Sequence, residues 1–154
     1  MNPRIRRLIS DHKQMTAVFG GHPYIRILKT EGNPPEKYTV EFQVQGLVPT
    51  GEKGFTQGQA HRAEIFLPLD YPRRQPLCRM ITPVFHPNID PQKICIGDHW
   101  SAGQSLAALV VRIGEMIAYQ SYNVKSPLNA EAAAWAEEHM DQLPLEQKDL
   151  GVGL

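Results

Sequence analysis

The residues best suited to chemistry lie together in one short segment. Asn88, within the run His86-Pro87-Asn88-Ile89, stands seven positions before Cys95. A cysteine thiolate can accept an acyl group as a thioester and release it to another nucleophile. A carboxamide held near the sulfur can donate a hydrogen bond to the oxyanion that forms on the attacked carbonyl. This pattern predicts acyl transfer through Cys95, with Asn88 as the oxyanion donor.

Two structural interpretations compete with this chemistry. A free cysteine is often fully buried, so Cys95 could be a core thiol, and Asn88 could be an ordinary turn residue. The position of Cys95 in a loop favours the functional interpretation, because loops carry a large share of catalytic residues. Cys78 differs, since it alternates with Met80 in a predicted strand, and we expect it in the core.

The loop that holds these residues spans 83–103 and shows no convincing periodicity. Long loops of this kind inside a domain are commonly functional. Four strand patterns precede it, over residues 24–29, 38–44, 63–67 and 77–82, and a polar loop is expected over 49–59. Four consecutive strands without intervening helices favour an antiparallel meander.

Helices are predicted on both sides of the strands. Asn2 can cap a helix that ends at Gly20-Gly21, and Ser105 can cap a second helix with a clear apolar stripe. A third helix is expected from about 129 to 140, because an asparagine precedes an alanine run and Pro144 prevents much extension. The predicted fold class is therefore α+β, with an amino-terminal helix, a meander, a long loop and carboxy-terminal helices.

Composition limits the size and the partners. A chain of 154 residues suits one domain, which we place at residues 1–145, followed by a flexible tail over 146–154. Sixteen basic residues balance sixteen acidic ones, which argues against bulk binding to nucleic acid or to a membrane surface. Two cysteines make no disulfide scaffold and no apolar stretch could span a membrane, so we expect a cytoplasmic protein.

The joint order of several motifs resembles the ubiquitin-conjugating enzymes, which carry ubiquitin-like proteins as thioesters. The resemblance covers roughly residues 3–140 and implies the same arrangement of helices and strands. The motifs that carry it are Tyr71-Pro72, Pro76, His86-Pro87-Asn88-Ile89, Ile94-Cys95, Trp100-Ser101 and Ser126-Pro127-Leu128.

The resemblance also implies roles for single residues. Cys95 matches the thioester cysteine, and Asn88 matches the asparagine that stabilises the oxyanion or holds the active-site loop. His86 matches a histidine that buttresses this loop, and Trp100 a tryptophan that packs near it, for which a plain core position is the alternative. Tyr122-Asn123 lies where the family places residues that gate the approach of lysine, although an ordinary turn is an equal interpretation.

The partners implied by the resemblance are a ubiquitin-like modifier, an activating enzyme, an acceptor protein and, where one takes part, a ligase. No cofactor or metal is implied. The cations Arg4, Arg6 and Arg7 oppose the dipole of the first helix, which in the family docks the activating enzyme; a solvated basic face is the alternative. Arg73 and Ala102 replace an aromatic residue and a proline that help to dock RING-type ligases, so the resemblance does not predict dependence on such a ligase.

One further departure concerns lysine activation. Ser126 stands where many members have an acidic residue that orients the incoming lysine, and Asp98 could substitute if its loop approaches Cys95. Together these departures resemble the divergent prokaryotic branch of the family. Its bacterial members are encoded beside ubiquitin-like proteins and activating enzymes and are often tied to antiviral defence.

Three other functions stay open on the sequence. A cysteine hydrolase could pair Cys95 with His99 or His86, although no third orienting group is evident. A zinc site built from His86, Cys95 and His99 would lack a clear fourth ligand. A conjugating-enzyme variant that only binds partners is the non-enzymatic alternative, and the retention of Cys95 counts against it.

Overall fold

The computed structural model describes residues 2–51, 53–97 and 100–154 of the chain. The elements in chain order are α1 (Pro3–Phe19), β1 (Ile25–Gly32), β2 (Pro35–Phe42), β3 (Gly46–Pro49), β4 (Phe55–Gly58), β5 (His61–Phe66), β6 (Leu77–Met80), α2 (Leu106–Ile117), α3 (Ala130–Glu138) and the short 3-10 helix η2 (Met140–Gln142). Among these described residues, no helix has the length and apolar character required to cross a membrane.

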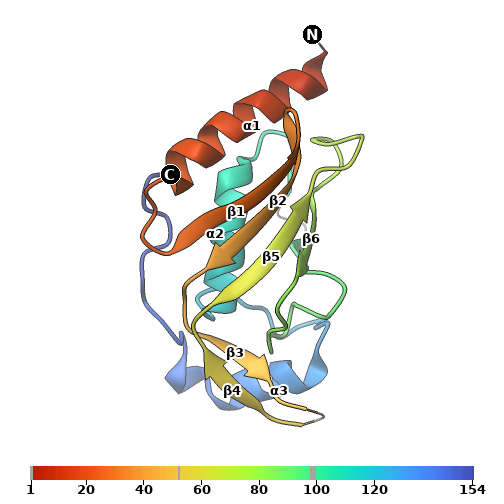
Figure 1. Cartoon of the computed structure of the whole chain (residues 1–154). Coiled ribbons are helices and arrows are strands. Elements are labelled where there is room, and N and C mark those ends of the chain that lie inside the picture. The colour runs from red at the N-terminus through yellow and green to blue at the C-terminus, as the bar shows by residue number, and fades with distance from the viewer. Residues whose placement is uncertain (1, 52, 98–99) are drawn as a thin grey trace.

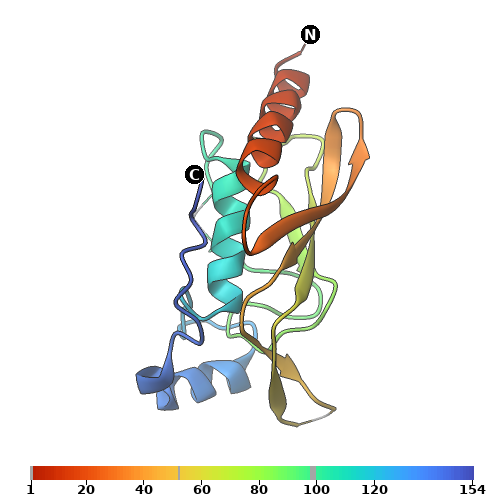
Figure 2. The ribbon, with the colours of Figure 1, turned by 60° about the vertical axis from the view of Figure 1, so that its left-hand side comes forward.

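Strands β1, β2, β5 and β6 form a four-stranded antiparallel sheet in that order, which confirms the predicted meander (Figure 1). Tyr38, Val40 and Phe42 of β2 pair with Ile65, Ala63 and His61 of β5. These six side chains are fully buried, because alternate residues of a strand point to the same face of a sheet. This buried face is the one that α2 covers (Figures 1 and 2).

The expected polar loop over 49–59 is partly wrong, because β3 and β4 pair there as a separate antiparallel hairpin. The ring of Phe55 stacks on Phe85 with centroids 4.9 Å apart and meets Trp135 edge-on at 5.2 Å. These aromatic contacts stabilise a hairpin whose strands are short and end in glycine and proline. A local pattern of polar and glycine residues does not reveal such distant packing.

The helix starts follow the predicted caps. The side chain of Asn2 accepts a hydrogen bond from the Ile5 amide at 2.8 Å, and Ser105 accepts one from Ala108 at 3.0 Å. Asn129 likewise accepts from the amide of Ala132 at 3.0 Å at the start of α3. Each cap satisfies a backbone N–H that has no partner within its own helix. The Ser105 cap places the start of α2 directly after the long loop that carries Cys95.

The carboxy-terminal segment, for which a flexible tail is predicted over 146–154, packs against the body at Leu150. In Figure 2 it runs back alongside α2. Leu150 is 1% exposed, and its carbonyl oxygen lies 2.9 Å from Nε2 of His22. Gly114 of α2 leaves the necessary space, since a Cβ there would lie 3.0 Å from Leu150 and 3.1 Å from Phe42. The buried side chain of Leu150 holds the carboxy-terminal segment against the body. The polar composition of this segment gives no sign of that contact.

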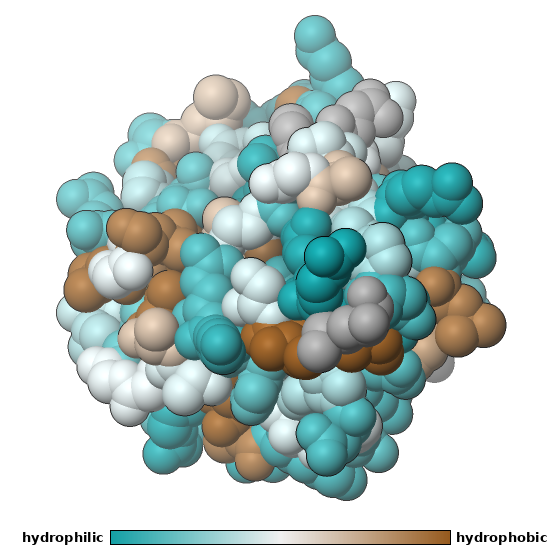
Figure 3. Space-filling model, turned by 90° about the horizontal axis from the view of Figure 1, so that it is seen from above, coloured by the Kyte–Doolittle hydropathy of each residue, from teal (hydrophilic) through white to brown (hydrophobic). Residues whose placement is uncertain are grey.

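The outer surface is mainly hydrophilic when viewed from the side of α1, and its hydrophobic residues form separate patches (Figure 3). Cys78 lies inside, as predicted, and complete burial raises the pKa of its thiol to about 12. A thiol held neutral in this way is a packing group rather than a nucleophile. The core therefore leaves one of the two cysteines, Cys95, for chemistry at the surface.

Candidate active site

The segment around His86 is anchored by the imidazole ring of this residue, which is fully buried. Its Nδ1 accepts a hydrogen bond from the backbone N–H of Asn88 at 3.0 Å, so the proton is on Nε2, which donates to the carbonyl oxygen of Ser121 at 3.2 Å. Burial lowers the pKa of His86 to about 4. The neutral ring thus joins the loop to the chain that follows α2.

Asn88 makes a second connection between the same two segments. Its Nδ2 donates to the carbonyl oxygen of Asn123 at 2.9 Å, and its Oδ1 accepts from the backbone N–H of Asn123 at 2.9 Å. The backbone oxygen of Asn88 also accepts from the N–H of Cys95 at 2.9 Å. One residue therefore holds the cysteine on one side and the segment after α2 on the other.

Cys95 is exposed and lines a cavity of about 320 Å³. The interpretation of Cys95 as a core thiol is therefore wrong. The other residues around this cavity are Asn88, Gly97, Arg112, Met116, Ser121, Tyr122 and Asn123. The cavity is open to solvent and brings polar groups from the loop, from α2 and from the chain after α2 to the cysteine.

The other predicted site residues near Cys95 in the resemblance have different placements. Tyr122 and Asn123 line the Cys95 cavity, and their effect on the approach of lysine stays a prediction. Ser126 is exposed, has a φ of 52° and is not among the residues that line the cavity. Asp98, the candidate substitute for the missing acidic residue, lies outside the described residues, as does His99.

Arg112 is the group at the Cys95 cavity that the sequence interpretation missed. It lies half-buried on α2, between the buried residues Val111 and Ile113. In the sequence it has the pattern of a solvated position on an amphipathic helix, with no motif around it. Only the packing of α2 beside the loop shows that this residue lines the same cavity as Cys95.

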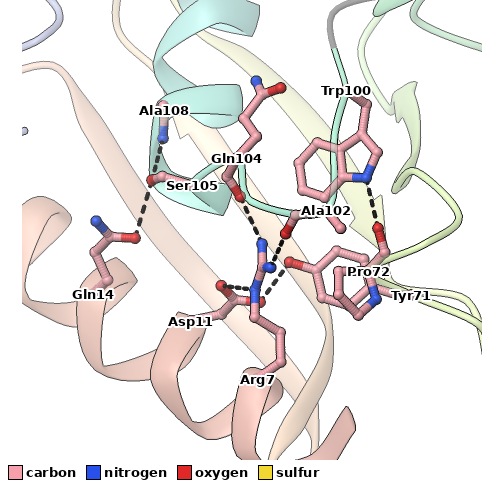
Figure 4. A network of polar contacts seen from close by, with 10 residues as sticks. All are labelled: Arg7, Asp11, Gln14, Tyr71, Pro72, Trp100, Ala102, Gln104, Ser105 and Ala108. Atoms are coloured by element: carbon pink, nitrogen blue, oxygen red, sulfur yellow. Dashed lines mark hydrogen bonds and ion pairs between the residues drawn. The ribbon is translucent and has the colours of Figure 1, made fainter. Parts of the chain in front are cut away.

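Trp100 does not line that cavity and acts as an anchor for the end of the loop (Figure 4). Its Nε1 donates to the carbonyl oxygen of Pro72 at 2.8 Å, and its ring lies 5.7 Å from that of Tyr71. The guanidinium carbon of Arg7 lies 5.1 Å from the Tyr71 ring centroid and 5.8 Å from that of Trp100. A cation over two aromatic faces favours both rings in these positions.

Arg7 extends this anchor from α1 to the start of α2. It forms an ion pair with Asp11 at 2.9 Å and donates to the carbonyl oxygens of Gln104, at 2.6 Å, and of Ala102 (Figure 4). The pKa of Asp11 is raised, because desolvation by burial outweighs its hydrogen bonds with Tyr71 and Arg7. The segment between the loop and α2 is therefore held to α1 by a largely buried polar network.

The four arginines expected to bind partners separate into two kinds. Arg4 pairs with Glu36 at 3.1 Å and donates to the carbonyl oxygens of Leu67 and Pro68, so it and Arg7 serve intramolecular contacts. Arg6 on α1 and Arg73 before β6 are exposed. Partner binding stays a prediction for these two positions.

His86 can serve neither as the base of a cysteine hydrolase nor as a zinc ligand. Both of its ring nitrogens are engaged within the fold, so it has no free nitrogen for a proton from Cys95 or for a metal ion. Within residues 2–51, 53–97 and 100–154, no group of three His, Cys, Asp or Glu side chains could hold a metal ion.

Comparisons with known proteins agree with this geometry. A family model described as "Ubiquitin-conjugating enzyme" matches residues 29–147. "Ubiquitin-conjugating enzyme E2 N" of Drosophila melanogaster is 34% identical over 84 residues, which are 51% of this chain and 54% of that protein. The protein of the same name from Macaca fascicularis is 31% identical over the same shares. The chain thus spans about half the length of the curated relatives it matches, while the family model covers most of it: the chain belongs to the ubiquitin-conjugating enzyme family.

Proposed function

We propose that this protein carries a ubiquitin-like protein as a thioester on Cys95 and transfers it to a lysine amine of an acceptor protein. The observation that carries the proposal is the exposed Cys95 in a cavity that Asn88 and Arg112 also line. An accessible nucleophile beside hydrogen-bond donors is the arrangement that acyl transfer requires.

The first step exchanges one thioester for another. The thiolate of Cys95 attacks the carbonyl carbon of the modifier on the activating enzyme, a new S–C bond forms, and the thiolate of the activating enzyme leaves. This step needs no strong general base, since an ordinary thiol is a few per cent thiolate at neutral pH and sulfur is intrinsically nucleophilic. An exposed position is therefore the main requirement for charging.

The second step is the harder one. The lysine amine attacks the thioester carbon, negative charge develops on the carbonyl oxygen, the C–N bond forms and the amine loses a proton, and the C–S bond then breaks to release the Cys95 thiolate. Asn88 gives one Nδ2 hydrogen to Asn123, which leaves the second for the oxyanion. Arg112 adds a positive charge at the same cavity, and this charge would stabilise the negative charge that develops on the carbonyl oxygen.

The proton of the attacking amine needs an acceptor. None of the residues described as lining the cavity is a carboxylate, so nothing in that part of the chain replaces the acidic residue absent at Ser126. Asp98, outside the described residues, stays the candidate named by the sequence. Tyr122 and Asn123 line the cavity and are proposed to limit the approach of the amine.

The proposed partners are the modifier, an activating enzyme, an acceptor protein and a ligase, in keeping with the family. We propose little reliance on a RING-type ligase, since Arg73 presents a charge in place of an aromatic ring and Arg7 holds the carbonyl oxygen of Ala102. A prokaryotic source and a role in antiviral defence stay predictions from the resemblance, and a cytoplasmic location stays a prediction from the cysteine content.

The test is a charging reaction with ATP, an activating enzyme and its modifier, first ubiquitin and then a ubiquitin-like protein encoded beside this gene. Gels run with and without a thiol reductant should show a reductant-sensitive adduct on the wild-type protein and on Cys78→Ala. Cys95→Ser should form a more stable, reductant-resistant ester, and Cys95→Ala should form none.

Three outcomes would contradict the proposal. An adduct that persists in Cys95→Ala would exclude Cys95 as the nucleophile. A wild-type protein that stays uncharged while both activating enzymes carry their modifiers would favour the variant that only binds partners. Loss of length of the modifier during the reaction would indicate a hydrolase instead.

A further inference from the structure

A second cavity, of about 510 Å³, shares no lining residue with the Cys95 cavity and has no part in the chemistry described above. We call it the α3 groove, because residues at the start of α3 form one side of it. Met80, Val84, Ile89 and Leu128 give it an apolar lining, and Asp90 and Glu131 add two carboxylates. Its volume is within the range of sites that hold small ligands or a few side chains.

The α3 groove is joined to the active-site loop by the backbone. Asn88 lines the Cys95 cavity and Ile89 lines the groove, and neighbouring Cα atoms are about 3.8 Å apart. The backbone N–H groups of Leu128 and Asn129 both donate to the carbonyl oxygen of Pro87, at 2.8 and 3.1 Å. A chain bound in the groove would thus contact the loop whose neighbouring residue, Asn88, lines the Cys95 cavity.

The charge of the α3 groove indicates the kind of chain that fits. Asp90 accepts the backbone N–H groups of Gln92 and Lys93 on its Oδ1, at 2.8 and 2.9 Å, which leaves Oδ2 available to a ligand. Glu131 is exposed in the first turn of α3. None of the residues that line the groove, all of them within the described ranges, is basic. The groove therefore combines an apolar lining with uncompensated negative charge.

We propose that the α3 groove binds a segment of the acceptor protein in which an apolar side chain lies close to an arginine or lysine. The apolar side chain would be buried against Ile81, which is 45% exposed, and Leu128, and the cation would pair with Asp90 and Glu131. This inference rests on the proposed function, which identifies the bound protein as the acceptor. It adds the local sequence that the acceptor presents to the groove. A lysine within a few residues of such a segment is placed near Cys95.

The experiment measures peptide binding without a modifier. The 15N-labelled full-length protein is titrated with the peptide Ac-Gly-Leu-Ala-Lys-Ala-Arg-Gly-NH2 and followed by two-dimensional NMR. Saturable shift changes are expected at the amides of Ile89, Asp90, Leu128 and Ala130. Two further peptides carry serine in place of leucine or glutamate in place of arginine, and both should bind more weakly.

A charge-reversed variant tests whether the cation of the peptide pairs with Glu131. Glu131→Lys should weaken binding of the leucine and arginine peptide up to about fivefold, the range measured for single exposed charge pairs. Glu138→Lys, which makes the same change at the other end of α3, should bind like the wild-type protein. Glu131→Gln tests the loss of charge alone, and the spectra themselves report whether each variant is folded.

Each result bears on the groove separately from the thioester chemistry. Shifts that do not saturate, that cluster away from the α3 groove, or that are equal for all three peptides would overturn the inference. Shifts that depend on protein concentration without peptide would assign the groove to a second copy of the chain and overturn it as well. An uncharged Cys95 together with specific peptide binding would refute the proposed carrier function and leave the groove as a peptide site.

Discussion

Asn88 provides the sharpest test of the mechanism, because its carboxamide has one structural and one proposed catalytic task. Two hydrogen bonds of 2.9 Å tie it to the backbone of Asn123, and its remaining N–H is the proposed oxyanion donor. Removal of one such donor typically costs about 10²–10³ in rate, or roughly 3–4 kcal/mol. We therefore expect Asn88→Ala to slow lysine transfer by about this factor and to slow charging of Cys95 far less.

The structural task alone predicts a different result. Two hydrogen bonds each contribute roughly 0.5–1.5 kcal/mol, so their loss would loosen the loop by about 1–3 kcal/mol. A loosened loop would change every reaction of Cys95 alike, including alkylation by neutral iodoacetamide. Asn88→Asp keeps an acceptor for the Asn123 N–H but has no N–H to donate, so it loses the oxyanion donor and only one of the two bonds to Asn123. Asn123→Ala keeps both bonds, because they use its backbone, and therefore measures the effect of the Asn123 side chain separately.

The assay uses a thioester formed in advance on Cys95, freed from ATP and mixed with free lysine, and its decay is followed on non-reducing gels. Charging is measured separately with the activating enzyme in excess. Asn88→Ala and Asn88→Asp should both transfer slowly. Equal slowing of charging and transfer in Asn88→Ala, or normal transfer by Asn88→Asp, would refute the oxyanion role.

Three further predictions concern the surroundings of the site. Arg7→Gln removes a largely buried ion pair and two hydrogen bonds to backbone carbonyls, so it should lower the free energy of unfolding, measured in urea, by about 2–4 kcal/mol. Arg7→Lys should restore only part of this stability. An unchanged unfolding midpoint would show that the network of Figure 4 adds no stability. Burial lowers the pKa of His86 from 6.5 to about 4, so the unfolded chain binds more protons between these values. The free energy of unfolding should therefore fall, by up to about 3 kcal/mol, as the pH decreases from 7 to 4, and His86→Gln should reduce this pH dependence; equal dependence in both proteins would contradict it. Arg112→Gln should lower the ratio of iodoacetate to iodoacetamide alkylation at Cys95 by up to about fivefold, while Arg112→Lys keeps it, and an unchanged ratio would exclude a charge effect of Arg112 at the sulfur.

Features that depend on contacts between near neighbours could be predicted from the sequence, and features that depend on contacts between distant residues could not. Asn2, Ser105 and Asn129 each cap an amide three residues away, so the helix starts could be predicted from neighbouring residues alone. The order of the four sheet strands was predictable because strands that follow one another without intervening helices favour an antiparallel meander. The β3–β4 hairpin was missed because Phe55 is held by rings at positions 85 and 135.

The motif around Cys95 and Asn88 was visible in the sequence because the cysteine, the asparagine and the buried histidine lie within ten residues of one another. What stands opposite them was decided by tertiary structure. Arg112 reaches the same cavity only because α2 packs beside the loop, and Arg7 bonds to Ala102 across 95 positions of the chain. Leu150 is buried against α2 although its neighbours are polar. Periodicity and caps record contacts between near neighbours, whereas contacts between distant residues depend on how the sheet and helices pack together, which no local pattern encodes.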